Sequence, residues 1–86
     1  MRLLVSSEAL KDLRRLDRKL VATIQVRMGK IADDPLGLHP QAKPLKGSPS
    51  RFRLRVGDWR VLYVVDRRAG TVEIVRVKSR QEAYRE

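Results

Sequence analysis

The most regular pattern in the chain is an alternation of arginine and apolar residues over residues 51–56, RFRLRV. This period of two predicts a β-strand with one face on the core and the other face exposed. Gly57 and Asp58 follow, and they favour a type II′ hairpin turn because its first position needs positive φ. Residues 59–66 are almost continuously apolar, as in a central strand, and residues 71–78 predict a further strand.

The first half of the chain has a helical period. Residues 2–5 are a short β-prone run, and Ser6 or Ser7 then offers a hydroxyl for a helix N-cap. Leucines spaced by three predict an amphipathic helix that runs to about residue 16. Asp17 resembles a new N-cap, and a second apolar stripe predicts a helix over residues 18–33. We expect the two helices to form an antiparallel hairpin.

These elements predict one domain, residues 1–86, in the order β-α-α-β-β-β. Residues 36–50 contain scattered prolines and glycines without a period and are expected to be a loop, and residues 79–86 a terminal turn or tail. The fold class is α+β, with the helical hairpin packed on a small, mainly antiparallel sheet of three or four strands. A helix-turn-helix DNA-binding motif is the alternative for the helical segment, although no glycine turn or base-reading face supports it.

The charge of the chain points to polyanionic partners. Twenty Lys and Arg against ten Asp and Glu give a net charge of +10 and a pI of about 11.1. Nucleic acid is the first candidate partner, followed by an acidic protein and an anionic membrane surface, and a solvated basic surface is the functionless alternative. The chain has no cysteine and no apolar run long enough to span a bilayer, so we expect a soluble, cytoplasmic protein.

The free face of the predicted sheet is expected to carry Arg53, Arg55 and Arg60. Guanidinium groups bind phosphate through paired hydrogen bonds, but their pKa is too high for them to serve as a base. The same arginines could instead be the solvated face of an edge strand, where charge deters aggregation. One histidine, His39, and scattered carboxylates predict no metal site, and no cofactor is expected. Further contacts to RNA are predicted for Lys43, Lys46, Arg51, Arg76, Lys78 and Arg85.

The hairpin and the tail together resemble a known family. The stretch LKGSPSRFRLRVGDWRVLYVVD, followed by VEIVRVKSRQEAYR, resembles the RelE/ParE superfamily of toxin–antitoxin toxins. The N-terminal helix, with Ala9, Leu13 and Leu16, fits that pattern too, so the resemblance covers essentially the whole chain. It implies a β-α-α-β-β-β fold and a cognate antitoxin, with which the toxin could form a hetero-oligomer.

The resemblance implies two alternative activities. RelE-like members cut mRNA on the ribosome without metal, by attack of the 2′-hydroxyl, whereas ParE-like members poison DNA gyrase. A degenerate member that only binds nucleic acid or antitoxin is a third possibility. Arg80 and Tyr84 favour the RelE side. By position, the catalytic set falls on Arg53, Arg55, Arg60, Arg80 and Tyr84.

Within that set, Arg53, Arg60 and Arg80 would hold the scissile phosphate, and Tyr84 would stack on or polarise the adjacent nucleotide. Arg55 occupies a position that is lysine in the best-known RelE-type toxin, where a base role has been considered. Many relatives have Gly-His immediately before the tail arginine. This chain has Lys78 and Ser79 there, so that position supplies no imidazole.

Overall fold

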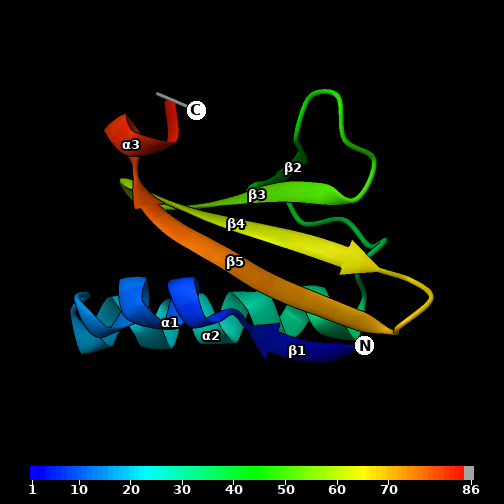
Figure 1. Ribbon diagram of the computed structural model, residues 1–86, viewed down its shortest axis with the longest axis horizontal. Coiled ribbons are helices and arrows are strands. Elements are labelled where there is room, and N and C mark those ends of the chain that lie inside the picture. The colour runs from blue at the N-terminus through cyan, green and yellow to red at the C-terminus, as the bar shows by residue number, and fades with distance from the viewer. Residues whose placement is uncertain (85–86) are drawn as a thin grey trace.

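The computed structural model describes the backbone of residues 1–84 and the side chains of residues 1–82. Helices cover one face of a single curved sheet, and a short C-terminal helix lies at the other face (Figure 1). The elements are β1 (Arg2–Val5), α1 (Ser7–Arg14), α2 (Arg18–Asp33), β2 (Ala42–Pro44), β3 (Arg51–Val56), β4 (Trp59–Asp66), β5 (Thr71–Ser79) and α3 (Arg80–Tyr84).

The sheet confirms the predicted α+β class, with strand order β1-β5-β4-β3-β2 and only the β1–β5 pair parallel. The expected number of strands was wrong, because β2 lies inside the stretch predicted to be a loop. Ala42 pairs with Leu54 and Pro44 with Phe52, so β2 forms by docking on β3 rather than from its own pattern. Pro44 is compatible with this position because β2 is an edge strand of the sheet.

The core lies between α2 and the sheet. The predicted stripe of α2 contributes Ile24, Met28 and Ile31, which are at most 1% exposed, and the alternating strands supply the opposite side. In α1 the buried residue is Ala9, whereas Leu10 is 43% exposed, so the predicted leucine stripe was wrong at that position. A small residue there allows α1 to lie close against β5. Neither α1, α2 nor α3 is long and apolar enough to cross a membrane.

Serine at position 6 begins α1 as predicted. Its hydroxyl accepts a hydrogen bond from the backbone N–H of Ala9 at 3.0 Å and donates to the carbonyl of Val75 at 3.0 Å. The helix ends at Arg14, two residues before the expected end. Asp17 is the N-cap of α2, but its side chain makes no capping hydrogen bond.

Asp12 provides a hydrogen-bond acceptor for the part of the β5 edge that β1 does not pair with. The last pair of β1 is Val5 with Ile74, so the edge of β5 beyond it has no partner strand on that side. The Asp12 carboxylate accepts from the backbone N–H of Val77 at 2.8 Å and from Nε of Arg76 at 2.9 Å. Burial acts to raise the Asp12 pKa, but the hydrogen bonds from Arg76 and Val77 outweigh it and leave the pKa below its ordinary value.

The hairpin turn and α3 meet at one end of the sheet. Gly57 has φ +57°, whereas Asp58, like every other described residue that is not glycine, has no positive φ. A type II′ turn requires positive φ at its first central position alone, so Gly57 and Asp58 fit it. Ser79 and Glu82 form a reciprocal capping box at the start of α3, and the backbone N–H of Arg80 donates to the Asp58 carbonyl at 2.7 Å. The tail is therefore helical through residue 84 rather than a simple turn.

Candidate functional site

The face of the sheet opposite α1 and α2 carries rows of like charge. Across neighbouring strands Arg53 pairs with Lys43, and Arg60 pairs with Arg55 on one side and Lys78 on the other. The predicted position of Arg60 beside Arg55 is thus confirmed by the register. Like charges directly opposite one another destabilise a sheet. This arrangement therefore costs stability unless an anion lies between the side chains.

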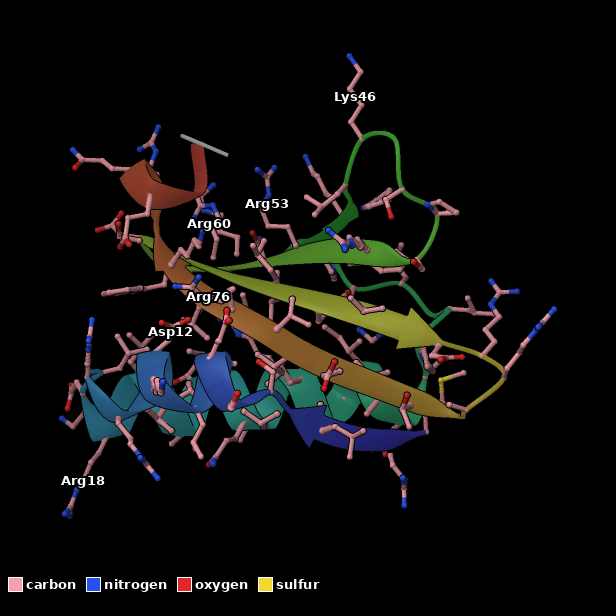
Figure 2. All side chains as sticks on the ribbon, in the orientation of Figure 1. Asp12, Arg18, Lys46, Arg53, Arg60 and Arg76 are labelled. Atoms are coloured by element: carbon pink, nitrogen blue, oxygen red, sulfur yellow. The ribbon has the colours of Figure 1, made fainter. Side chains whose placement is uncertain are left out.

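These cations surround a hollow of about 370 Å³, called the cationic hollow here. Arg53 and Arg60 project from the face of the sheet away from α1 and α2 (Figure 2). The lining residues are Pro40, Gln41, Lys43, Arg53, Arg55 and Arg60. None of these is acidic, so no carboxylate of the described residues stands in the lining beside the four positive charges. The arrangement suits a bound phosphate, which accepts several charge-assisted hydrogen bonds at once.

Arg60 is the most buried of these cations, at 5% exposure. Its Nη1 donates to the carbonyls of Gly57 at 3.1 Å and Trp59 at 3.0 Å. These bonds hold the guanidinium over the hairpin turn and use only one of its three nitrogens. Among the described residues its other N–H groups make no hydrogen bond, and because Arg60 lines the cationic hollow they can donate to a ligand there. The arginine is thus oriented before any ligand arrives.

The remaining predicted catalytic residues, Arg80 and Tyr84, are the first and last residues of α3. Arg80 lines a separate hollow of about 330 Å³ with Asp58, Ser79 and Gln81. Tyr84 is the last residue of α3, and its side chain lies outside the described residues. Packing of α3 against β4 and β5 brings this segment to the end of the sheet that carries Arg60 (Figure 2).

The predicted RNA contacts are spread more widely. Lys43 lines the cationic hollow, and Lys78 is buried beside Arg60. Lys46 points outward from the loop between β2 and β3 (Figure 2), and Arg51 starts β3 opposite Val64. Arg85 lies outside the described residues.

Arg76 lies on the same face as the cationic rows but is engaged by α1. Figure 2 shows it beside Asp12, which accepts its hydrogen bond, and a second carboxylate oxygen on Glu8 is 3.8 Å from Nη1. The hydrogen bond from Arg76 to Asp12 is the main cause that raises the Arg76 pKa above its ordinary value. The ion pair between Arg76 and Asp12 therefore serves mainly to hold α1 against the edge of β5.

Two residues of the cationic hollow, Pro40 and Gln41, were missed by sequence reasoning. They belong to the predicted loop, and only the pairing of β2 with β3 brings them to the arginines. No local sequence signal could have found them. The helix α3 was also missed, although its capping box, Ser79 to Glu82, is visible in the sequence as S-x-x-E.

Neither Tyr63 nor His39 lines the cationic hollow. Tyr63 is 3% exposed, stacks on Phe52 with ring centroids 5.3 Å apart, and burial raises its pKa to about 12. It is a structural residue. The Nε2 atom of His39 lies 2.7 Å from the carbonyl of Asp34. Among the described residues, no three His, Cys, Asp or Glu side chains come together as metal ligands would.

Known proteins match this chain over most of its length. Residues 3–84 match the family described as the ParE toxin of the type II toxin–antitoxin system parDE. Toxin RelE of Mycobacterium tuberculosis is 31% identical over 83 residues, 94% of this chain and 82% of that protein. Toxin RelG of the same organism is 34% identical over 82 residues, 93% of this chain and 91% of that protein.

Solved structures show the same fold. The RelBE2 toxin–antitoxin complex of Mycobacterium tuberculosis aligns with a TM-score of 0.74 and 30% identity, over 92% of this chain and 96% of that chain. The isolated RelE toxin of E. coli aligns with a TM-score of 0.78 at 18% identity, over 98% of this chain and 95% of that chain. At that identity, the likeness to the E. coli protein concerns the fold alone.

Fold, cationic face and relatives together define a toxin of a type II toxin–antitoxin system. The chain belongs to the ParE toxin family, and the curated relatives described above carry the names RelE and RelG. The predicted membership of the RelE/ParE superfamily is therefore confirmed.

Proposed function

We propose that this toxin is an endoribonuclease that cuts mRNA on the ribosome and so inhibits translation. The observation that carries the proposal is the cationic hollow, where Arg53, Arg55 and Arg60 converge and no described lining residue is acidic. Opposed like charges are costly in a sheet, and such local costs are typical of functional sites. The RelE names of the relatives support the same activity.

The chemistry follows from what guanidinium groups do well. The 2′-oxygen of the ribose bonds to phosphorus, and the bond from phosphorus to the 5′-oxygen of the next nucleotide breaks. Negative charge grows on the phosphoryl oxygens in the transition state, where fixed cations stabilise it most. The proton of the 2′-hydroxyl passes to a base and another reaches the leaving 5′-oxygen. Tyr84 and groups of the ribosome are the candidates for these proton transfers, because arginine is a poor base.

The natural inhibitor would be a cognate antitoxin protein. Solved neighbours include antitoxin–toxin complexes, which supports a comparable hetero-oligomer for this toxin. We propose that it acts in the cytoplasm. A net charge of +10 favours an antitoxin segment rich in Asp and Glu. Such a segment lying over the cationic face would exclude the RNA phosphate.

The test is cleavage in a purified translation system with defined mRNA. We expect Arg53→Ala and Arg80→Ala each to lower the cleavage rate by about 10²–10³, the usual cost of removing one group that stabilises transition-state charge. Tyr84→Phe should also slow cleavage if the phenol moves a proton. The matched control is Arg18→Ala, which removes an exposed arginine far from the cationic hollow (Figure 2) and should leave the rate unchanged. Absence of cleavage by the wild-type toxin would refute the proposal.

The family description supports a second candidate, inhibition of DNA gyrase by a ParE-like mechanism. In that case the toxin acts by binding a protein and not as a nuclease. A gyrase supercoiling assay separates the two functions, because only a gyrase poison produces broken or unsupercoiled plasmid while leaving mRNA intact on the ribosome.

A further inference from the structure

A second hollow adjoins the cationic hollow at the end of β2. It has a volume of about 320 Å³ and lies between α2 and β3; we call it the α2 hollow. Its lining residues are Arg27, Lys30, Ile31, His39, Pro40, Gln41 and Leu54. Pro40 and Gln41 line both hollows, so a single short segment forms the wall between them.

The two hollows lie on opposite faces of β3 at its edge. Arg53 and Arg55 point to the cationic face, whereas Leu54 points to the core side and lines the α2 hollow. At this edge the Arg55 N–H donates to the Gln41 carbonyl at 2.9 Å. The Arg55 carbonyl accepts from Nη1 of Arg27 at 3.2 Å. These two hydrogen bonds tie the Gln41 segment and α2 to the edge of β3, where the two hollows adjoin.

The α2 hollow has the chemistry of a site for a flat, partly polar ring. Its floor includes the apolar side chains of Ile31 and Leu54, beside the Pro40 ring. The Gln41 side chain offers a donor and an acceptor, and it has no hydrogen-bond partner among the described residues. A hollow of this size, apolar with a few polar groups at its rim, is typical of small-ligand sites.

His39 adds a second polar group with a defined role. The Asp34 carbonyl can only accept, so the nearby Nε2 of His39 carries a proton and donates to it. In the neutral ring Nδ1 is then an acceptor. Gln41 and His39 together offer the donors and acceptors that the edge of a nucleobase requires.

We propose that the α2 hollow binds the base of the nucleotide whose phosphate occupies the cationic hollow, and that Gln41 contributes to base selectivity. This inference rests on the proposed function and adds to it a base-binding subsite. A nucleotide joins a phosphate to a flat base that has apolar faces and a polar edge. The phosphate matches the cationic hollow, and the base matches the α2 hollow, which shares the wall of Pro40 and Gln41 with it. Single-stranded RNA is commonly read through unstacked bases inserted into such sites.

The test is an NMR titration of the full chain, which needs no ribosome. The probes are AMP, GMP, CMP and UMP, with ribose 5-phosphate as the ligand that lacks a base. We expect all five to shift the amide signals of Arg53 and Arg55, and only the nucleotides to shift those of Lys30, Ile31 and His39. Equal perturbation by ribose 5-phosphate and the nucleotides, or no binding by any of them, would overturn the inference.

The decisive variant is Gln41→Ala, which removes the amide but keeps the backbone carbonyl that pairs with Arg55. We expect the preferred nucleotide to bind about two- to tenfold more weakly, the usual effect of one hydrogen bond, and ribose 5-phosphate to bind unchanged. Gln25→Ala, the same change at an exposed position on α2 outside both hollows, is the control and should change neither affinity. An equal loss for both ligands in Gln41→Ala would contradict a role in base selection.

This experiment and the cleavage assay can fail separately. Cleavage on the ribosome without nucleotide shifts in the α2 hollow would overturn the subsite and leave the proposed function intact. Base-dependent shifts without cleavage would support the subsite and reject the nuclease proposal.

Discussion

Replacing Asp12 with alanine tests whether Arg76 serves mainly the fold or mainly RNA. The Asp12 carboxylate accepts from Val77 N–H at 2.8 Å and from Arg76 at 2.9 and 3.4 Å. The Asp12 side chain is only 15% exposed and Val77 only 4%, so alanine leaves a buried N–H without a partner. An unsatisfied buried donor costs about 1–3 kcal/mol, and the lost ion pair with Arg76, whose side chain is 37% exposed, adds about 1 kcal/mol.

We therefore expect Asp12→Ala to lower the free energy of unfolding by about 2–4 kcal/mol. A chain of this length typically has roughly 4–13 kcal/mol in total, at about 0.05–0.15 kcal/mol per residue, so the loss is large. It corresponds to a fall in Tm of about 10–25 °C. Asp12→Asn retains an acceptor for Val77 and should cost about half as much.

The control is Glu8→Ala, which removes the other carboxylate near Arg76. Glu8 is 70% exposed and 3.8 Å from Nη1, so its ion pair is worth less than about 1 kcal/mol. The measurements are urea unfolding of each variant at pH 7 and at low pH. Because the pKa of Asp12 is lower in the folded state, its ionised carboxylate stabilises the fold at pH values above the ordinary pKa of 3.8. That stabilisation is lost as the pH falls below 3.8 and through the folded-state pKa.

Equal stability of Asp12→Ala and Glu8→Ala would refute this account of the β5 edge. The same account predicts that Arg76→Ala lowers stability and leaves the cleavage rate of the folded fraction unchanged. A large loss of cleavage in a fully folded Arg76→Ala variant would instead assign Arg76 to the RNA site.

Two further predictions concern backbone and tyrosine. Gly57→Ala should destabilise the fold by about 1–2 kcal/mol in urea unfolding, because φ is +57° at that position. Gly29→Ala should instead stabilise the fold by about 0.5–1 kcal/mol, because Gly29 lies within α2 and a Cβ atom there meets open space. Both substitutions having the same sign would contradict the turn assignment. Burial raises the Tyr63 pKa from 10.0 to about 12, so the folded state holds this proton more tightly and stability falls as pH rises above 10. Between pH 8 and pH 11 the free energy of unfolding of the wild type should fall by about 1.4 kcal/mol more than that of Tyr63→Phe. Parallel curves of unfolding free energy against pH for the two proteins would exclude the effect.

Short-range patterns predicted most of the fold. The alternation over residues 51–56 determined which side chains of β3 face the core, because a strand has a period of two. Gly57 determined the hairpin turn. A two-residue turn fixes the pairing of the two strands, and it therefore placed Arg60 opposite Arg55. The apolar stripe over residues 18–33 likewise predicted α2 to the residue.

Long-range contacts decided the rest. β2 has no strand pattern and forms only because β3 offers a free edge, and this pairing brings Pro40 and Gln41 to the arginines. Arg76 has the same sequence signature as Arg53, and only the position of α1 against β5 gives it a carboxylate partner. The sequence by itself therefore determined β1, β3, β4, β5, the two long helices and a basic sheet face, but neither β2 nor α3. Which cations share one hollow, and which are held by the fold, depended on contacts between residues far apart in the chain, and a local pattern does not encode them.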